Sequence, residues 1–272
     1  MSNHLLNRKD APFDQKTWDH MDSTVIAAAK SQLSVRRIVE LEGPYGLGLR
    51  AVPGADEEIP AKGAQGASLY AASAIPLAGI VARFFVSARD IASLEATGLP
   101  FDASAAASAG MSCAMQEESI LLYGADALGT SGLLTAKGTS SMKLHSWKMV
   151  GTAADDIIAA VTRLDESGFH GPYALALAPA LYNLLFRRYE QGQMTELEHL
   201  KSIVTDGLVK SPSLKAGGAL LASGRQFTSI VVGQDITVGF VGPAAGGYDL
   251  TVSESVALRM RRPGAVCVLK GE

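Results

Sequence analysis

Two adjacent glutamates, Glu117 and Glu118, are the residues of this sequence that come nearest to an acid–base pair. They lie in a segment rich in Ala and Met, which favours a helix. Neighbouring side chains on a helix point about 100° apart, so the two carboxylates cannot converge on one atom unaided. We therefore favour a salt bridge to a neighbouring segment over acid–base catalysis for these residues.

Other catalytic patterns are missing from the sequence. It contains no Gly-x-Ser-x-Gly turn and no P-loop. Cys113 and Cys267 lie far apart in apolar surroundings, which indicates buried free thiols. The histidines show no His-Glu-x-x-His motif or paired spacing; they are His4, His20, His145, His170 and His199. We expect no catalytic residue and no metal site.

Composition excludes further classes of function. The chain has 272 residues, a net charge of −3 and 47% hydrophobic residues, many of them Ala. The charge gives no reason to expect a nucleic-acid partner. The longest apolar stretch is too short to cross a bilayer, and the N-terminal residues lack the apolar core of a signal peptide. We expect a cytoplasmic protein that makes extensive contacts between subunits.

Hydrophobic spacing predicts the elements that would position functional residues. An amphipathic helix of about five turns follows Asp14, and residues 102–124 form a long central helix. Residues 55–76 show no periodicity and read as an arm that folds against a neighbour. Helices and buried strands follow, and residues 231–240 alternate like one strand despite Gly233 and Asp235. This order indicates an α+β fold with one unit inserted into another.

Four segments carry a resemblance to a known family. They are SQLSVRRIVELEGPYG (31–46), EESILLYGADALGTSGLL (117–134), ESGFHGPYALALAPALYNLLFRRYE (166–190) and VVGQDITVGF (231–240). In this order they resemble the encapsulins, the linocin-type shell proteins of bacterial and archaeal nanocompartments, over about residues 5 to 270.

The resemblance implies the major capsid protein fold of tailed phages. Its parts would be an N-terminal arm and lumen-facing helix, an E-loop, a P-domain with a long spine helix, and an A-domain. The expected ranges are 1–40 for the arm and helix, 50–76 for the E-loop, 77–129 with 226–272 for the P-domain, and 130–225 for the A-domain.

The resemblance also implies two functional places. Cargo enzymes of the family dock by C-terminal peptides in a groove inside the shell. The matching residues here are Ala29, Leu33, Arg36, Ile38, Glu40, Asp235, Ile236 and Val238. A loop of the A-domain lines a pore at a symmetry axis, and its matching residues are Tyr189, Glu190, Gln191, Gly192 and Gln193. Within the cargo groove, the apolar side chains would offer pockets, and the charged ones would pair with the peptide.

The expected function is a self-assembling icosahedral shell that is not itself an enzyme. Its cargo would be a ferritin-like iron-storage protein or a dye-decolourising peroxidase, and its pores would gate small solutes. Some members hold a flavin beside an aromatic residue, but the matching position here is Arg89, so we expect no cofactor. A phage major capsid protein is the alternative, and a protease or bacteriocin-type hydrolase is less favoured. The partners are copies of the chain and the cargo, with no nucleic acid and no membrane.

Overall fold

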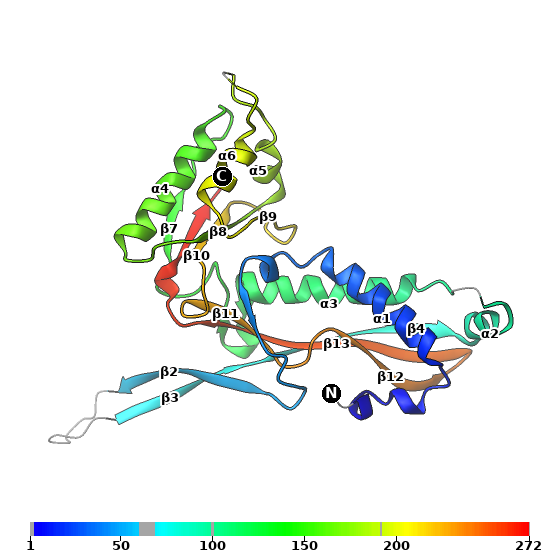
Figure 1. Ribbon diagram of the computed structural model, residues 1–272. Coiled ribbons are helices and arrows are strands. Elements are labelled where there is room, and N and C mark those ends of the chain that lie inside the picture. The colour runs from blue at the N-terminus through cyan, green and yellow to red at the C-terminus, as the bar shows by residue number, and fades with distance from the viewer. Residues whose placement is uncertain (1–2, 60–68, 99–100, 191, 272) are drawn as a thin grey trace.

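The computed structural model describes residues 3–59, 69–98, 101–190 and 192–271. The chain forms two bodies and an arm that projects from them (Figure 1). The first body is long and flat and contains helices α1 and α3. The second body stands at one end of the first, and the arm leaves the same end in another direction. In the described part of the chain, no helix is long and apolar enough to cross a membrane.

A twisted sheet forms the base of the first body. Its central strand β13 (Gly247–Met260) pairs antiparallel with β4, β11 and β12, and β1 joins the edge of β11 in parallel. The other strands are β1 (Glu40–Glu42), β4 (Ala78–Ser87), β11 (Thr228–Val232) and β12 (Thr237–Ala244). The sheet buries one face through alternating apolar positions, such as Leu250 and Val252.

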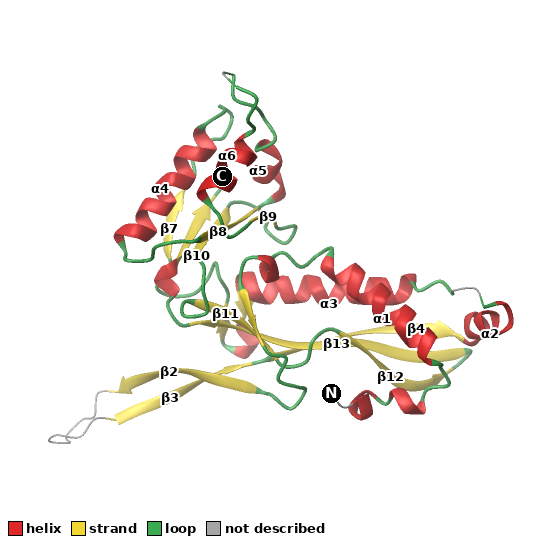
Figure 2. Cartoon of the chain, viewed as in Figure 1, coloured by secondary structure: helices red, strands yellow, loops and turns green. Residues whose placement is uncertain are grey.

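Two helices pack along this sheet (Figure 2). Helix α1 (Gln15–Lys30) begins where predicted, because the Asp14 carboxylate accepts the Thr17 N–H at 2.8 Å. Helix α3 (Ser104–Tyr123) is the predicted long helix. The two helices approach closely at Gly110, where an added methyl group would lie 2.9 Å from the Val25 carbonyl oxygen. A short helix, α2 (Ala88–Thr97), follows β4.

The arm is a two-stranded antiparallel hairpin of β2 (Ala51–Ile59) and β3 (Leu69–Pro76). Figure 1 shows it extending away from both bodies. Leu69 and Tyr70 are exposed on it. The middle of the predicted E-loop, residues 60–68, lies outside the described residues.

The second body has its own mixed sheet in the order β7-β14-β10-β8-β9. Its strands are β7 (Ser140–Lys143), β8 (Tyr173–Leu177), β9 (Leu208–Lys210), β10 (Gly218–Ala222) and β14 (Val266–Lys270). Its helices are α4 (Thr152–Glu166), α5 (Pro179–Leu184) and α6 (Glu196–Ile203). Two very short strands, β5 (Gly124–Ala125) and β6 (Thr130–Ser131), pair just after α3.

The two bodies share a core through the second sheet. Along β8, Leu175 and Leu177 pack in the cluster that includes α4, whereas Ala174 and Ala176 pack in the cluster that includes α3. This alternation follows from the two-residue repeat of a strand. The face of β8 that packs against the first body thus carries small side chains.

Two sequence predictions need correction. Strand β14 pairs with β10 and β7, so the predicted grouping of residues 226–272 into the first body is wrong for its last strand. The predicted continuous strand over residues 231–240 is also wrong. Residues 233–236 form a bend between β11 and β12 because two residues of β13, Glu254 and Ser255, face these four.

Candidate functional site

The 233–236 bend is held rigidly to the rest of the first body. Ser255 on β13 binds the first two residues of the bend: its carbonyl oxygen accepts the Gly233 N–H at 2.8 Å, and its N–H donates to the Gln234 carbonyl oxygen at 2.9 Å. The Gly46 N–H donates to the Gly233 carbonyl oxygen from a third segment. A methyl group on Gly233 would overlap the Ser255 hydroxyl, so the close packing here favours glycine.

Arg36 ties the bend to α3 and β13. Its guanidinium lies 2.7 Å from Glu117, 2.8 Å from Asp235 and 3.1 Å from Glu254. Burial by itself lowers the pKa of Arg36, but the hydrogen bonds and charges of Glu117 and Asp235 raise it on balance. The expected salt bridge of Glu117 is confirmed. Arg36 is thereby occupied within its own chain, although the Asp235 side chain is still 59% exposed.

The neighbouring carboxylate has a different partner. Glu118 accepts the backbone N–H groups of Ser34 and Val35, each at 2.8 Å, and also the Ser34 hydroxyl. It therefore fixes the turn that carries Arg36. Burial raises the pKa of Glu118 although these hydrogen bonds oppose the rise.

The structure brings three of the predicted apolar residues together. Ala29 and Leu33, at the end of α1, form a small buried cluster with Ala114 of α3, and Ile236 packs against it while staying partly exposed. Ile26 lies one turn before Ala29 on α1 and is exposed. Because Ala29 and Leu33 are buried, the apolar area that this region exposes comes from Ile236 and Ile26, and Asp235 adds an exposed carboxylate.

The other three predicted residues do not line this surface. Val238 is buried in the main core of the first body, so the prediction that it offers an open pocket is wrong. Ile38 is also mostly buried, but it lines a hollow that lies on another side of Arg36. Glu40 makes an ion pair with Arg225 at 2.9 Å instead of approaching Asp235. Glu40 and Arg225 line this hollow, which has a volume of about 440 Å³, together with Arg36 and Ile38.

Sequence reasoning missed two residues that shape this region. Arg8 binds the Val238 carbonyl oxygen at 2.8 Å and Asp22 at 2.6 Å, so the N-terminal segment covers the start of β12. Glu254 is fully buried beneath Arg36. The sequence offers one indication for Glu254, which is a charged residue within a predicted apolar strand. It offers no indication that Arg8 would contact β12.

The predicted pore loop lies at the far end of the second body (Figure 1). The Tyr189 N–H donates to the Met194 carbonyl oxygen, and its hydroxyl lies 2.8 Å from His199 Nδ1. Tyr189 therefore anchors the loop rather than lining its tip. Glu190, Gly192 and Gln193 are exposed, whereas Gln191 lies outside the described residues.

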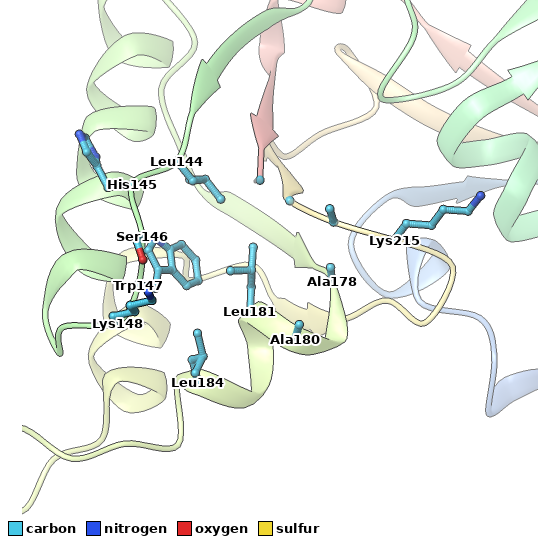
Figure 3. A pocket seen from close by; sticks show the side chains of 13 residues that line it. Leu144, His145, Ser146, Trp147, Lys148, Ala178, Ala180, Leu181, Leu184 and Lys215 are labelled. Atoms are coloured by element: carbon cyan, nitrogen blue, oxygen red, sulfur yellow. The ribbon is translucent and has the colours of Figure 1, made fainter.

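An apolar pocket of about 300 Å³ lies in the second body, between the loop after β7 and helix α5. Trp147, Leu181 and Leu184 point into it (Figure 3). The buried Asp156 orders this loop by accepting the Trp147 indole N–H at 2.7 Å and binding His145 Nδ1 at 2.6 Å. The His145 ring is exposed and turns away from the pocket, so it brings no acid–base group into the cavity (Figure 3).

Neither cysteine pairs with another, and both are buried, as predicted. Within the described ranges no cluster of three His, Cys, Asp or Glu side chains is placed to hold a metal ion.

Comparison with known proteins shows the family to which the chain belongs. A family model described as "Encapsulating protein for peroxidase" matches residues 2–257. The type 1 encapsulin shell protein EncA of Myxococcus xanthus is 32% identical, over 98% of this chain and 96% of its own length.

Solved structures share the architecture. A virus-like particle from Pyrococcus furiosus superposes with a TM-score of 0.71 at 24% identity, covering 91% of this chain and 97% of that one. The capsid of Myoviridae phage XM1 gives a TM-score of 0.59 at 13% identity, covering 87% and 90%. At these identities, both likenesses show the fold, which is the predicted α+β fold of tailed-phage capsid proteins.

Proposed function

Because the chain belongs to the encapsulin family of shell proteins, we propose that the surface around the 233–236 bend docks the C-terminal peptide of an enzyme that the shell encloses. The family is structural rather than enzymatic, and copies of this chain assemble into a compartment. The phage likeness is one of fold alone, so a phage capsid protein is the weaker reading.

One observation carries the docking proposal. The exposed Asp235 and the partly exposed Ile236 stand side by side on a rigid bend, next to the end of α1. A peptide with a basic residue beside an apolar one matches this pair. Arg36 holds Asp235 from below, so the carboxylate is already oriented and loses little freedom when a peptide binds.

A single peptide should bind weakly. The exposed apolar area is small, and each square ångström that is buried contributes only about 25 cal/mol, from which the ordering of the peptide must be subtracted. An oligomeric cargo presents several peptides to many copies of the surface, and linked binding events raise the overall affinity about 10²–10⁴-fold. Weak individual sites are therefore sufficient for encapsulation.

The cargo we propose is a peroxidase or a ferritin-like iron-storage protein. The description of the matching family model names a peroxidase as the encapsulated protein. The ferritin-like alternative rests on the family resemblance. In both cases small substrates must cross the shell, which requires pores.

The proposed pore is a ring of the loop that carries Glu190, Gly192 and Gln193. These residues are exposed at the end of the second body, and Tyr189 fixes the base of the loop. Repeated around a symmetry axis, Glu190 would form a ring of carboxylates that favours cations. Replacing Glu190 with Lys should slow the entry of Tb³⁺ to a chelator inside the shell without a change in shell diameter.

The arm supplies a further proposed contact. The arm extends from the first body as a hairpin on which Leu69 and Tyr70 are exposed. Packing against a neighbouring subunit would bury these two side chains. Such an exchange would lock copies of the chain together.

Docking can be tested with Asp235→Lys, produced in the native host. Arg36 keeps Glu117 and Glu254 as partners, so the subunit should fold and assemble, whereas a basic peptide residue would be repelled. We expect intact shells that retain little cargo on purification. The matched control, Asp249→Lys on β13, should retain it. Equal cargo in both variants would contradict the proposed site.

A further inference from the structure

Two fully buried carboxylates face each other inside the first body. Glu117 comes from α3 and Glu254 from β13, and neither side chain has any exposed area. Each gives one oxygen to Arg36. The other oxygens, Glu117 Oε2 and Glu254 Oε1, find no hydrogen-bond donor among the described residues.

The charges in this cluster do not balance. One guanidinium serves three acids, since Arg36 also binds Asp235, and the Glu117 and Glu254 carboxyl groups lie within hydrogen-bonding reach of each other. Two ionised carboxylates repel, and neither can donate a hydrogen bond. One proton between the two unpartnered oxygens would satisfy both and leave the pair with one negative charge instead of two.

We propose that Glu117 and Glu254 form a buried proton-binding site, in which one proton shared by the two carboxyl groups holds α3, β13 and the 233–236 bend together. The bend is part of this assembly through Arg36, which contacts Asp235 and both members of the pair. The inference concerns the fold of the subunit and stands independently of cargo docking.

The ionisable groups around the pair agree with this assignment. They are Arg36 from the turn after α1, Cys113 and Glu118 from α3, and Asp235 from the bend. The residue of β4 that pairs with Glu254 is Ile80, which has no charge. Burial is the largest cause that raises the pKa of Glu254 to about 9, and the charge of Glu117 is the next. Burial and the charge of Glu254 raise the pKa of Cys113 to about 11.

The direction of the pH dependence follows from the pKa of Glu254. The folded value of about 9 lies above the ordinary value of 4.5, so the folded subunit keeps a proton that the unfolded chain releases. The shared proton therefore stabilises the fold fully below about pH 4.5, and this contribution declines as the pH rises to about 9. Above that range the pair carries two charges, and Arg36 no longer balances them.

Glu254→Gln tests the site in the assembled shell. The amide keeps the shape of the side chain and supplies a permanent donor to Glu117. We expect the melting temperature of the natural protein to fall as the pH rises from about 5 to about 9, because the shared proton is lost. Glu254→Gln has no such proton to lose, so its melting temperature should not show this decrease. The variant should then melt above the natural protein at about pH 9. Glu166→Gln, on the exposed end of α4, is the matched control and should follow the natural protein.

Infrared difference spectroscopy gives a second measurement that does not depend on how the variant folds. At neutral pH the natural shell should show the carbonyl band of a buried protonated carboxylic acid, and alkali should remove it. Absence of this band would overturn the proposal, as would a Glu254→Gln variant with the same pH dependence of melting as the natural protein.

Discussion

Truncating Ile236 to Ala measures how much the bend contributes to peptide docking. The change removes three carbon atoms, which at about 0.8 kcal/mol each would be worth about 2.4 kcal/mol for complete burial. Ile236 already packs on Ala29 and Leu33, so we take about a third of this, roughly 0.8 kcal/mol, as the part that a peptide would newly cover. A single peptide should therefore bind about fourfold more weakly, and a cargo held by two peptides about fifteenfold more weakly.

The assay is fluorescence anisotropy of a synthetic peptide with the C-terminal sequence of the protein that co-purifies from the native host. Light scattering should confirm that the variant shell assembles, since the lost packing also costs about 1.6 kcal/mol of subunit stability. Val241→Ala, at an exposed position farther along β12, is the control and should bind as the natural shell does. Equal affinities for the two variants would refute the reasoning, because Ile236 would then contribute nothing to the surface.

Two further predictions concern the fold that supports this surface. Arg36→Met leaves Glu117 and Glu254 buried without their cation, so denaturant unfolding should show a loss of about 3–5 kcal/mol; a loss below about 1 kcal/mol would show that the cluster is not held by this residue. Gly247→Ala should reduce the yield of assembled shells and lower the melting temperature, because its methyl group would overlap the backbone of the neighbouring strand β4. The same change at Gly79 meets open space, and melting curves that fall equally for both glycines would contradict this account.

The sequence predicted the elements whose pattern is local. The helix after Asp14 and the long helix α3 have their caps or composition within a few turns, and both form as expected. The 233–236 bend was missed because residues 231–240 as a whole alternate like one strand, although Gln234 stands at one of the apolar positions. Only the pairing with β13, set by distant residues, shows that four residues there face two.

The spatial arrangement of the predicted site residues could be foreseen only in part, for the same reason. Ala29, Leu33 and Ile236 meet, but alternation alone does not reveal that Val238 points into the core while Ile236 points outward. Nor does it reveal the partner of Arg36 on β13, which is 218 residues away in the sequence. Contacts of this kind are fixed by the packing of α3 on the sheet rather than by any neighbouring residue.

The two alanines of β8 that pack against the first body have a consequence for the geometry of the assembled shell. Alanine side chains have no alternative rotamers, so Ala174 and Ala176 allow only one close packing of β8 against the first body. A fixed angle between the two bodies of each subunit would contribute to the curvature of the shell that copies of the chain form. The radius of the shell would then depend in part on an interface between two bodies of the same subunit.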